Sequence, residues 1–197
     1  TAYEMFDVPL EGMDPSIRRQ AKAINFGVIY GISGFGLARN LRIPRAKAQA
    51  FIDRYFERFP GIKVYMDQTK EFAKEHGYVQ TLFGRRINTP NINVKGPHSG
   101  FARRAAINAP IQGSAADIIR LAMIKIDEIL EKDKNNKAKM LLQIHDELIF
   151  ECPKKDEVKI KKIIKDTMIS VSSSDHHMFS IPLEVSINSG NNWGEAH

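Results

Sequence analysis

The sequence has a single cysteine, Cys152, and no apolar run approaching the ~20 residues of a membrane-spanning helix. A lone cysteine excludes an intrachain disulfide, a Cys-x-x-Cys redox pair and a zinc site built on several cysteines. The N-terminal stretch also lacks the basic start and the apolar centre of a secretory signal. We therefore expect a globular intracellular protein that has no membrane partner and works in a reducing compartment.

Acidic residues are scarce in the stretch 16–63. It holds ten Lys or Arg against Asp53 and Glu57, and 10 − 2 leaves a local charge of +8, compared with +6 for all 197 residues. An excess of this size attracts polyanions such as nucleic acid or nucleotides, although basic faces without a ligand are also common. Charge alone leaves both interpretations open.

Helical patterns dominate before residue 100, and strands join them afterwards. The sequence predicts helices at 15–30, 44–59 and 62–76, a hairpin at 78–88, a helix at 101–132 that contains Pro110, and a Lys-rich helix at 154–170. Two strands in KMLLQIHDELIFE and one in PLEVSI complete the pattern, and GISGFG is interpreted as a tight turn between helices. Separate blocks of helices and antiparallel strands indicate an α+β fold, with subdomains at 1–100 and 101–197.

The helix expected at 15–30 has two unlike faces. At about 100° per residue, one face takes Ile17, Ala21, Ile24 and Val28, and the opposite side takes Arg18, Lys22, Phe26 and Tyr30. Cations and aromatic rings on one surface suit a nucleoside triphosphate, with phosphates near Arg18 and Lys22 and the base near Tyr30. A second subdomain that covers the two aromatic rings is the alternative.

Three later segments carry candidate binding residues. Arg104, Asn108 and Gln112 form a polar stripe if their helix continues through Pro110, and such side chains suit a DNA minor groove, where every base pair presents acceptors. Arg85 and Arg86 in the hairpin could contact backbone phosphates. The third segment is the turn between two strands that we expect to be buried, formed by His145, Asp146 and Glu147. A solvated helix face, solvent-facing arginines and an exposed acidic turn are the respective alternatives.

The motif Arg18-x3-Lys22-x3-Phe26-x3-Tyr30-Gly31 resembles the fingers helix of family A DNA polymerases. The similarity continues through TLFGRR, RRAAINAPIQGSAADIIR, QIHDELIFE and NWGEAH, and so covers essentially the whole chain. This resemblance implies a template-directed 5′–3′ DNA polymerase that acts on primer–template DNA and deoxynucleoside triphosphates. It also implies a bacterial cytoplasmic location, with an organellar one left open.

The resemblance implies a role for each matching residue. Arg18 and Lys22 hold the triphosphate, Lys22 also counting as catalytic, while Phe26 lies against the sugar and Tyr30 with Gly31 guards the templating position. The residues implied to contact the minor groove are Arg104, Asn108 and Gln112. The other implied DNA contacts are Arg85, Arg86, Gln143 and His145, and His145 lies at the primer end. Asp146 and Glu147 are the catalytic carboxylates of the turn, and Asp146 is a ligand for catalytic Mg²⁺.

Two-metal phosphoryl transfer needs a pair of carboxylates around two cations that lie about 4 Å apart. The acidic DYSQIELR-like strand that carries the second Asp in this family is absent from the sequence, as are thumb and exonuclease domains. We therefore expect fingers plus a partial palm of a longer polymerase, inactive alone. The alternatives are a noncatalytic nucleic-acid or nucleotide-binding module and an HD-type metallophosphohydrolase, which would need ligands among His76, His98, His176 and His177.

Overall fold

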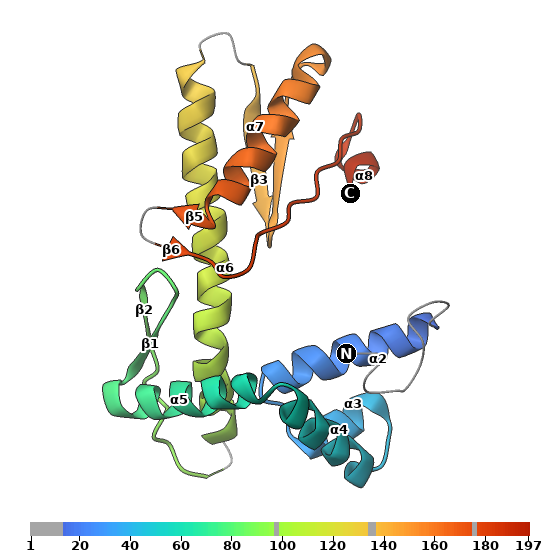
Figure 1. Ribbon diagram of the computed structural model, residues 1–197, viewed down its shortest axis with the longest axis vertical. Helices are drawn as coiled ribbons and strands as arrows, with labels where there is room; N and C mark the ends of the chain where they lie inside the picture. The colour runs from blue at the N-terminus through green and yellow to red at the C-terminus, as the bar shows by residue number, and fades with distance from the viewer. Residues whose placement is uncertain (1–13, 97–98, 134–136, 175–176) are drawn as a thin grey trace. The chain divides into compact units, whose positions relative to one another are not determined.

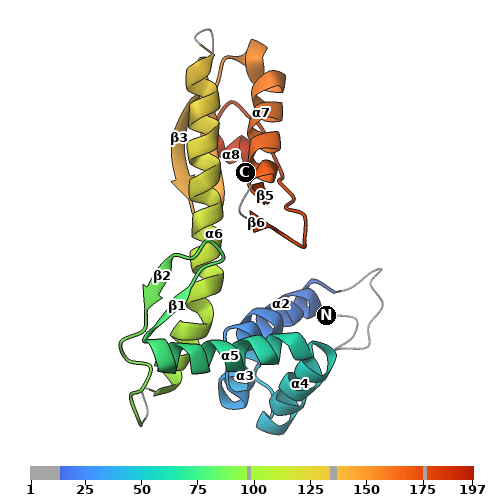
Figure 2. The same ribbon diagram turned by 60° about the vertical axis from the view of Figure 1, so that its left-hand side comes forward.

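The computed structural model describes residues 14–96, 99–133, 137–174 and 177–197, which fall into two compact units (Figures 1 and 2). Unit 1 takes in the described residues of Thr1–Gln80 and Arg86–Pro110, and unit 2 those of Thr81–Arg85 and Ile111–His197. Helices predominate, and the described residues also form three two-stranded antiparallel sheets. This confirms the α+β fold. Along α6 (Ser99–Lys132) the boundary between the two compact units lies after Pro110. The functional boundary expected at residue 100 stays a prediction.

The described part of unit 1 begins with four helices: α2 (Pro15–Ile29), α3 (Gly34–Leu41), α4 (Arg45–Arg58) and α5 (Pro60–His76). The helices predicted at 15–30, 44–59 and 62–76 are present, but the third begins at Pro60, two residues before the predicted start. Pro15 and Pro60 occupy first helical turns, where a missing N–H costs nothing, and Gly77 ends α5 with φ of 75°. One face of α2 packs against α3 and α4 in a core of Ile24, Val28, Leu37, Ala48, Phe51, Ile52 and Tyr55.

The prediction of a simple turn at GISGFG was wrong in its second half, because Gly34 begins α3. The Ser33 hydroxyl caps this helix by accepting a hydrogen bond from the Gly36 N–H at 3.1 Å. Leu37, which is fully buried, anchors the helix in the core. Gly34 lies so close to Gln49 of α4 that a Cβ would stand 2.5 Å from its side-chain oxygen. Packing of the helix on α4 thus outweighs the low helix propensity of its glycines.

A hairpin follows α5, as predicted. Its strands are β1 (Tyr78–Gln80) and β2 (Arg86–Asn88), with Val79 opposite Ile87. Val79 is buried with Ala73, Ile92 and Ala106 in a second small core of unit 1. The tip of the hairpin, Thr81–Arg85, belongs to unit 2.

The main part of unit 2 is a small sheet with two helices on one of its faces (Figures 1 and 2). The elements are α6 (Ser99–Lys132), which is unbroken at Pro110 and begins in unit 1, then β3 (Lys139–Ile144), β4 (Glu147–Glu151), η1 (Lys154–Asp156) and α7 (Glu157–Ser170). Ile126 and Leu130 of α6 pack with Ile160 and Ile164 of α7, and Met140, Leu148 and Phe150 of the sheet join them. One face of the sheet therefore carries the core.

The other predictions for unit 2 need correction. We expected β3 and β4 to be buried, but neither strand has a buried residue, since helices cover only one face of the sheet. PLEVSI, residues 182–187, forms no strand. The chain forms instead two very short strands, β5 (Ser173–Ser174) and β6 (His177–Met178), and a short helix, α8 (Trp193–Ala196). Among the described residues, no helix has the length and apolar character needed to cross a membrane.

Candidate functional site

The helix α2 is held at its N-terminus by Asp14. The Asp14 carboxylate accepts a hydrogen bond from the Ser16 N–H at 2.6 Å, and hydrogen bonding by the Ser16 side chain and then by its N–H lowers the pKa of Asp14. The helix ends at Ile29, and Gly31 follows its C-cap with a φ of 74°, the Ile32 N–H donating to the Gly27 carbonyl at 2.8 Å. This six-to-one bond is the Schellman ending that a glycine in the left-handed region permits. Both ends of the helix are therefore defined by local sequence.

The two faces of α2 differ as the sequence predicts. Ala21, Ile24 and Val28 are 5%, 0% and 1% exposed, whereas Phe26 on the other side is 47% exposed. Arg18 and Lys22 are also exposed, and Tyr30 is half-buried. The Lys22 ammonium lies 5.8 Å from the centre of the Phe26 ring, which lies 6.0 Å from the Tyr30 ring. Cation and aromatic rings thus form one continuous stripe directed away from the core of unit 1.

Tyr55 of α4 fixes α2 from behind. Its hydroxyl donates a 2.7 Å hydrogen bond to the Asn25 side-chain oxygen, and the ring is 2% exposed. Burial raises the pKa of Tyr55, so the hydroxyl remains a donor at neutral pH. Sequence reasoning missed this contact because the two residues lie 30 positions apart and neither has a motif of its own.

The end of α2 touches the first half of α6. A Cβ on Gly31 would lie 3.2 Å from Arg104 Cγ and 3.7 Å from the Ile107 side chain. Tyr65 of α5 donates a 2.9 Å hydrogen bond to the Ile107 carbonyl, and burial raises the pKa of this tyrosine. The candidate templating position therefore adjoins one of the predicted minor-groove residues within unit 1.

The polar stripe on α6 lies on an unbroken helix, which meets the condition set by Pro110. Arg104 and Gln112 are exposed, and Asn108 is half-buried. The Asn108 side-chain oxygen is enclosed and has no hydrogen-bond partner among the described residues. Buried polar atoms normally have partners, so this oxygen marks a place where a donor would be favourable.

The hairpin arginines have different surroundings. Arg85 Nε donates to an Asp117 oxygen at 2.7 Å and Arg85 Nη2 donates to the Gly113 carbonyl at 3.1 Å. The guanidinium carbon of Arg86 lies 4.6 Å from the centre of the Tyr78 ring, and Arg86 is exposed. Both were expected to contact DNA, and Arg85 has protein partners that the sequence did not reveal.

The turn between β3 and β4 presents His145 and Asp146 to solvent, and Glu147 begins β4. His145 has a φ of 52°, and its carbonyl accepts a 2.6 Å hydrogen bond from the Gln143 amide. His197 Nδ1 lies 3.3 Å from a Glu147 carboxylate oxygen. Gln143, His145, Asp146 and Glu147 are thus brought together at one end of the sheet, as predicted.

The described residues at this turn supply only part of a metal site. In the part of the chain that the structure describes, no three His, Cys, Asp or Glu side chains gather in a metal-binding cluster. Of the extra ligands that an HD-type site would need, His98 and His176 lie outside the described residues. Asp146 offers an exposed carboxylate, a donor type that suits Mg²⁺, but one carboxylate is only part of a site.

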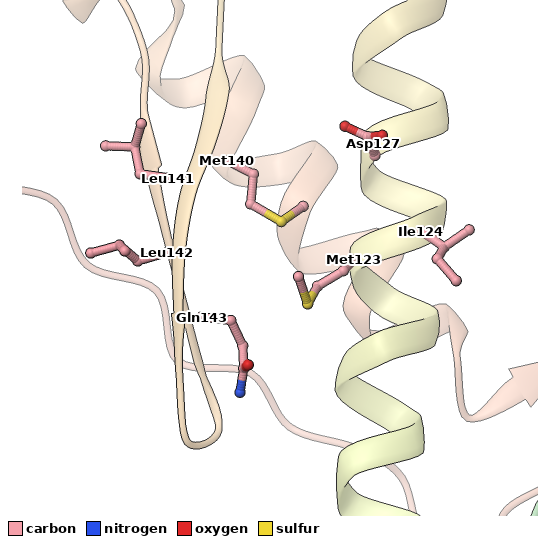
Figure 3. A pocket seen from close by; sticks show the side chains of 7 residues that line it. All are labelled: Met123, Ile124, Asp127, Met140, Leu141, Leu142 and Gln143. Carbon is pink, nitrogen blue, oxygen red and sulfur yellow. The ribbon is translucent and has the colours of Figure 1, made fainter.

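An apolar groove of about 410 Å³ runs beside the same sheet (Figure 3). Met123 and Asp127 of α6 and Met140 of β3 line it, and Met123 and Met140 point toward each other. The side chains of Leu141 and Leu142 extend from the side of β3 opposite Met140, and they are 49% and 53% exposed. A β-bulge between Met140 and Leu142 inserts one extra residue, so neighbouring leucines share one exposed side instead of alternating.

Comparison with known proteins gives concordant results. The family model for DNA polymerase family A matches residues 1–195. DNA polymerase I of Rhizobium leguminosarum is 53% identical over the whole chain, and that of Bacillus subtilis is 46% identical. The chain covers 20% and 22% of these two proteins. Among solved structures, the POL domain of Pol1 from M. smegmatis in complex with DNA primer-template and dNTP matches with a TM-score of 0.91 at 37% identity, covering 99% of this chain and 34% of that one.

The chain thus spans about a fifth of the length of these curated relatives. A family model that matches nearly every residue, together with relatives near half identity over the full chain, leaves no competing assignment. The chain belongs to DNA polymerase family A.

Proposed function

We propose that this chain supplies the fingers and part of the palm of a template-directed 5′–3′ DNA polymerase, with 1–100 as fingers and 101–197 as partial palm. The observation that carries the proposal is the stripe on α2, in which Lys22 and Phe26 adjoin Tyr30 on the face opposite the core. The POL domain described above was solved with DNA primer-template and dNTP, which supports the same partners here. The bacterial relatives favour a cytoplasmic location.

The stripe on α2 matches the dimensions of a nucleotide. Four helical residues rise about 6 Å, a distance that lets Arg18 and Lys22 bind neighbouring phosphates, and twelve residues rise about 18 Å, which places Tyr30 at the base end. Phe26, between them, lies against the sugar. A guanidinium and an ammonium stabilise the charge of the triphosphate through charge-assisted hydrogen bonds. Tyr30 and Gly31 border the templating base.

The second half of the site binds the primer–template. Arg104, Asn108 and Gln112 contact the minor groove, where acceptors at nearly constant positions test pairing geometry without reading sequence. Arg86 and Gln143 complete the DNA contacts, and His145 lies at the primer end.

Family A polymerases are metal-dependent enzymes. We assign Mg²⁺ as the metal and Asp146 as a ligand, with Glu147 beside it. When bound, two ions activate the primer hydroxyl and stabilise the charge of the triphosphate. Within this chain Asp146 supplies one carboxylate at the turn, and Lys22 holds the phosphates. The second carboxylate comes from a part of the polymerase outside these 197 residues, so the chain alone is inactive.

The rest of the palm also covers the exposed side of the β3–β4 sheet. Leu141 and Leu142 are half-exposed leucines beside a strand edge, an arrangement that favours an additional strand or helix. The relatives are about five times longer than this chain and have ample sequence for such a segment.

Primer extension tests the proposal. With Mg²⁺, primer–template and dNTPs, the chain alone should give no extension above a control without protein. In the complete polymerase that contains it, Asp146→Ala should abolish extension. Lys22→Ala should weaken nucleotide use about tenfold or more, because it removes a charge-assisted bond to the triphosphate. Unchanged kinetics in both variants would place the site elsewhere.

A further inference from the structure

The tip of the hairpin is attached to one turn of α6 by three hydrogen bonds. The Leu82 N–H donates to Ser114 Oγ at 2.8 Å, and Arg85 donates to Asp117 at 2.7 Å and to the Gly113 carbonyl at 3.1 Å. All of these residues belong to unit 2. Their acceptors span residues 113–117, which is one helical turn.

This turn of α6 is intrinsically weak. Pro110 has no N–H and therefore leaves the Ala106 carbonyl without its normal helical donor. Gly113 has the lowest helix propensity after proline. Gln112 lies between these two residues, so the helix that carries its side chain needs support from outside.

The hairpin tip is itself rigid enough to give that support. The Thr81 hydroxyl accepts hydrogen bonds from the N–H groups of Phe83 and Arg85 at 3.3 and 3.2 Å. Gly84 turns the chain with a φ of 78°. Thr81 and Ser114 are each 6% exposed, so the bonds that their hydroxyls accept are shielded from water, whereas the Arg85 side chain is 47% exposed. Shielding strengthens the bonds to the hydroxyls relative to bonds on an open surface.

Arg85 is suited to this junction by its shape. A planar guanidinium can donate in two directions at once, and here it joins a side-chain carboxylate and a main-chain carbonyl one turn apart. The Asp117 side chain is 13% exposed, and its other oxygen is enclosed with no hydrogen bond among the described residues. A largely buried carboxylate needs a cation beside it, and Arg85 is that cation.

We propose that Arg85 is a positioning residue, which fixes the turn of α6 that carries Gln112 and so sets the geometry with which Gln112 tests the primer terminus. The proposal rests on the minor-groove role proposed above for Gln112. Arg85 acts through Gln112 and makes no phosphate contact. The neighbouring Arg86, which stacks on Tyr78, keeps its donors for DNA.

The test uses the complete polymerase that contains this chain and measures extension from matched and mismatched primer ends. Gln112→Ala should reduce the preference for the matched end. Arg85→Lys, which keeps the charge but cannot make both bonds, should reduce it by up to about 100-fold, the effect that a misplacement of about 1 Å can have. The double variant should be no worse than the more severe single variant. Lys159→Gln breaks a surface ion pair of the same 2.7 Å length and should leave the preference unchanged.

Hydrogen exchange supplies a readout that does not depend on Gln112. Peptides covering 111–117 should exchange faster in Arg85→Lys, while α7 should be unchanged. Asp117→Asn, which retains an acceptor oxygen and disturbs folding least, should show the same pattern more weakly. Arg85→Gln should leave the salt dependence of DNA affinity unaltered.

Different failures have different meanings. If Gln112→Ala keeps full mismatch discrimination, the minor-groove role of Gln112 is wrong, and Arg85 does not act through it. A second case is that Gln112→Ala reduces the preference for the matched primer end as expected while the double variant loses the product of the two single effects. In that case Arg85 acts independently of Gln112, and the inference is overturned. Unchanged exchange at 111–117 overturns it as well. If Arg85→Gln lowers the slope of log DNA affinity against log salt concentration by about one, Arg85 makes a direct phosphate contact, and this result would also overturn the inference.

Discussion

Ile24→Ala should mainly lower the stability of the fold, and Phe26→Ala should mainly weaken nucleotide use, although the two residues are two positions apart on α2. Ile24 is 0% exposed, whereas Phe26 is 47% exposed. Alanine is the best helix former, so both substitutions favour the helix locally. The difference between the two variants must therefore come from what each side chain contacts.

The size of the effect follows from burial. Ile24→Ala removes buried methyl and methylene groups from the core shared with Leu37 and Phe51, which should cost about 2–5 kcal/mol of the free energy of unfolding. A fully buried phenylalanine costs about 3–5 kcal/mol on truncation, and about half of the Phe26 surface is already in water, so Phe26→Ala should cost roughly 1.5–2.5 kcal/mol. Marginal stability makes the first loss severe, since whole domains have about 5–15 kcal/mol.

Two measurements separate the faces. Urea unfolding followed by circular dichroism should show a much lower midpoint for Ile24→Ala than for Phe26→Ala. In the complete polymerase, below the unfolding temperature, Phe26→Ala should raise the KM for dNTPs and Ile24→Ala should leave it nearly unchanged. Equal losses of stability, or nucleotide use that depends on Ile24 instead, would refute the assignment of the triphosphate to the exposed stripe.

Three further predictions concern unit 1. Duplex DNA should bind through the basic stretch 16–63, with an affinity that falls as salt rises because phosphate contacts release counterions; a salt-independent affinity would argue for a merely solvated surface. Tyr55→Phe should cost about 1–2 kcal/mol because it leaves the Asn25 oxygen without its donor, and Asn25→Ala should add little to it when the two are combined. Hydrogen bonds from Lys63 and then Lys70 hold the pKa of Asp67 below its ordinary value. The contribution of Asp67 to the free energy of unfolding should therefore be complete above about pH 5 and be lost as pH falls through the lowered pKa. Asp67→Asn should lack this pH-dependent loss in acid unfolding, and identical curves of stability against pH for the two proteins would contradict the prediction.

The parts of the fold that follow local rules could be predicted from sequence. The cap at Asp14, the ending at Gly31, the ending at Gly77 and the turn at His145 each depend on residues a few positions apart. The two faces of α2 follow from helical periodicity alone. The stripe of candidate nucleotide ligands was therefore identifiable before any tertiary contact was known.

The features that sequence reasoning missed depend on distant residues. The α3 helix forms because Leu37 is buried against α4, despite two glycines in its first turn. The bonds from Arg85 to Asp117 and from Tyr55 to Asn25 join residues 32 and 30 positions apart. The bulge at Leu141 shifts the register of the strand, and alternation of side chains cannot reveal it. Tertiary packing decided each of these cases.

Gly31 meets two restrictions at once, and they limit how this position can vary. A side chain there would need a backbone φ of 74°, and its Cβ would crowd Arg104 at 3.2 Å. Shortening Arg104 would relieve the crowding but not the backbone strain, so a non-glycine residue there stays unfavourable. Variation that reshapes the proposed templating end of α2 is therefore expected mainly at Tyr30 and in the side chains around it.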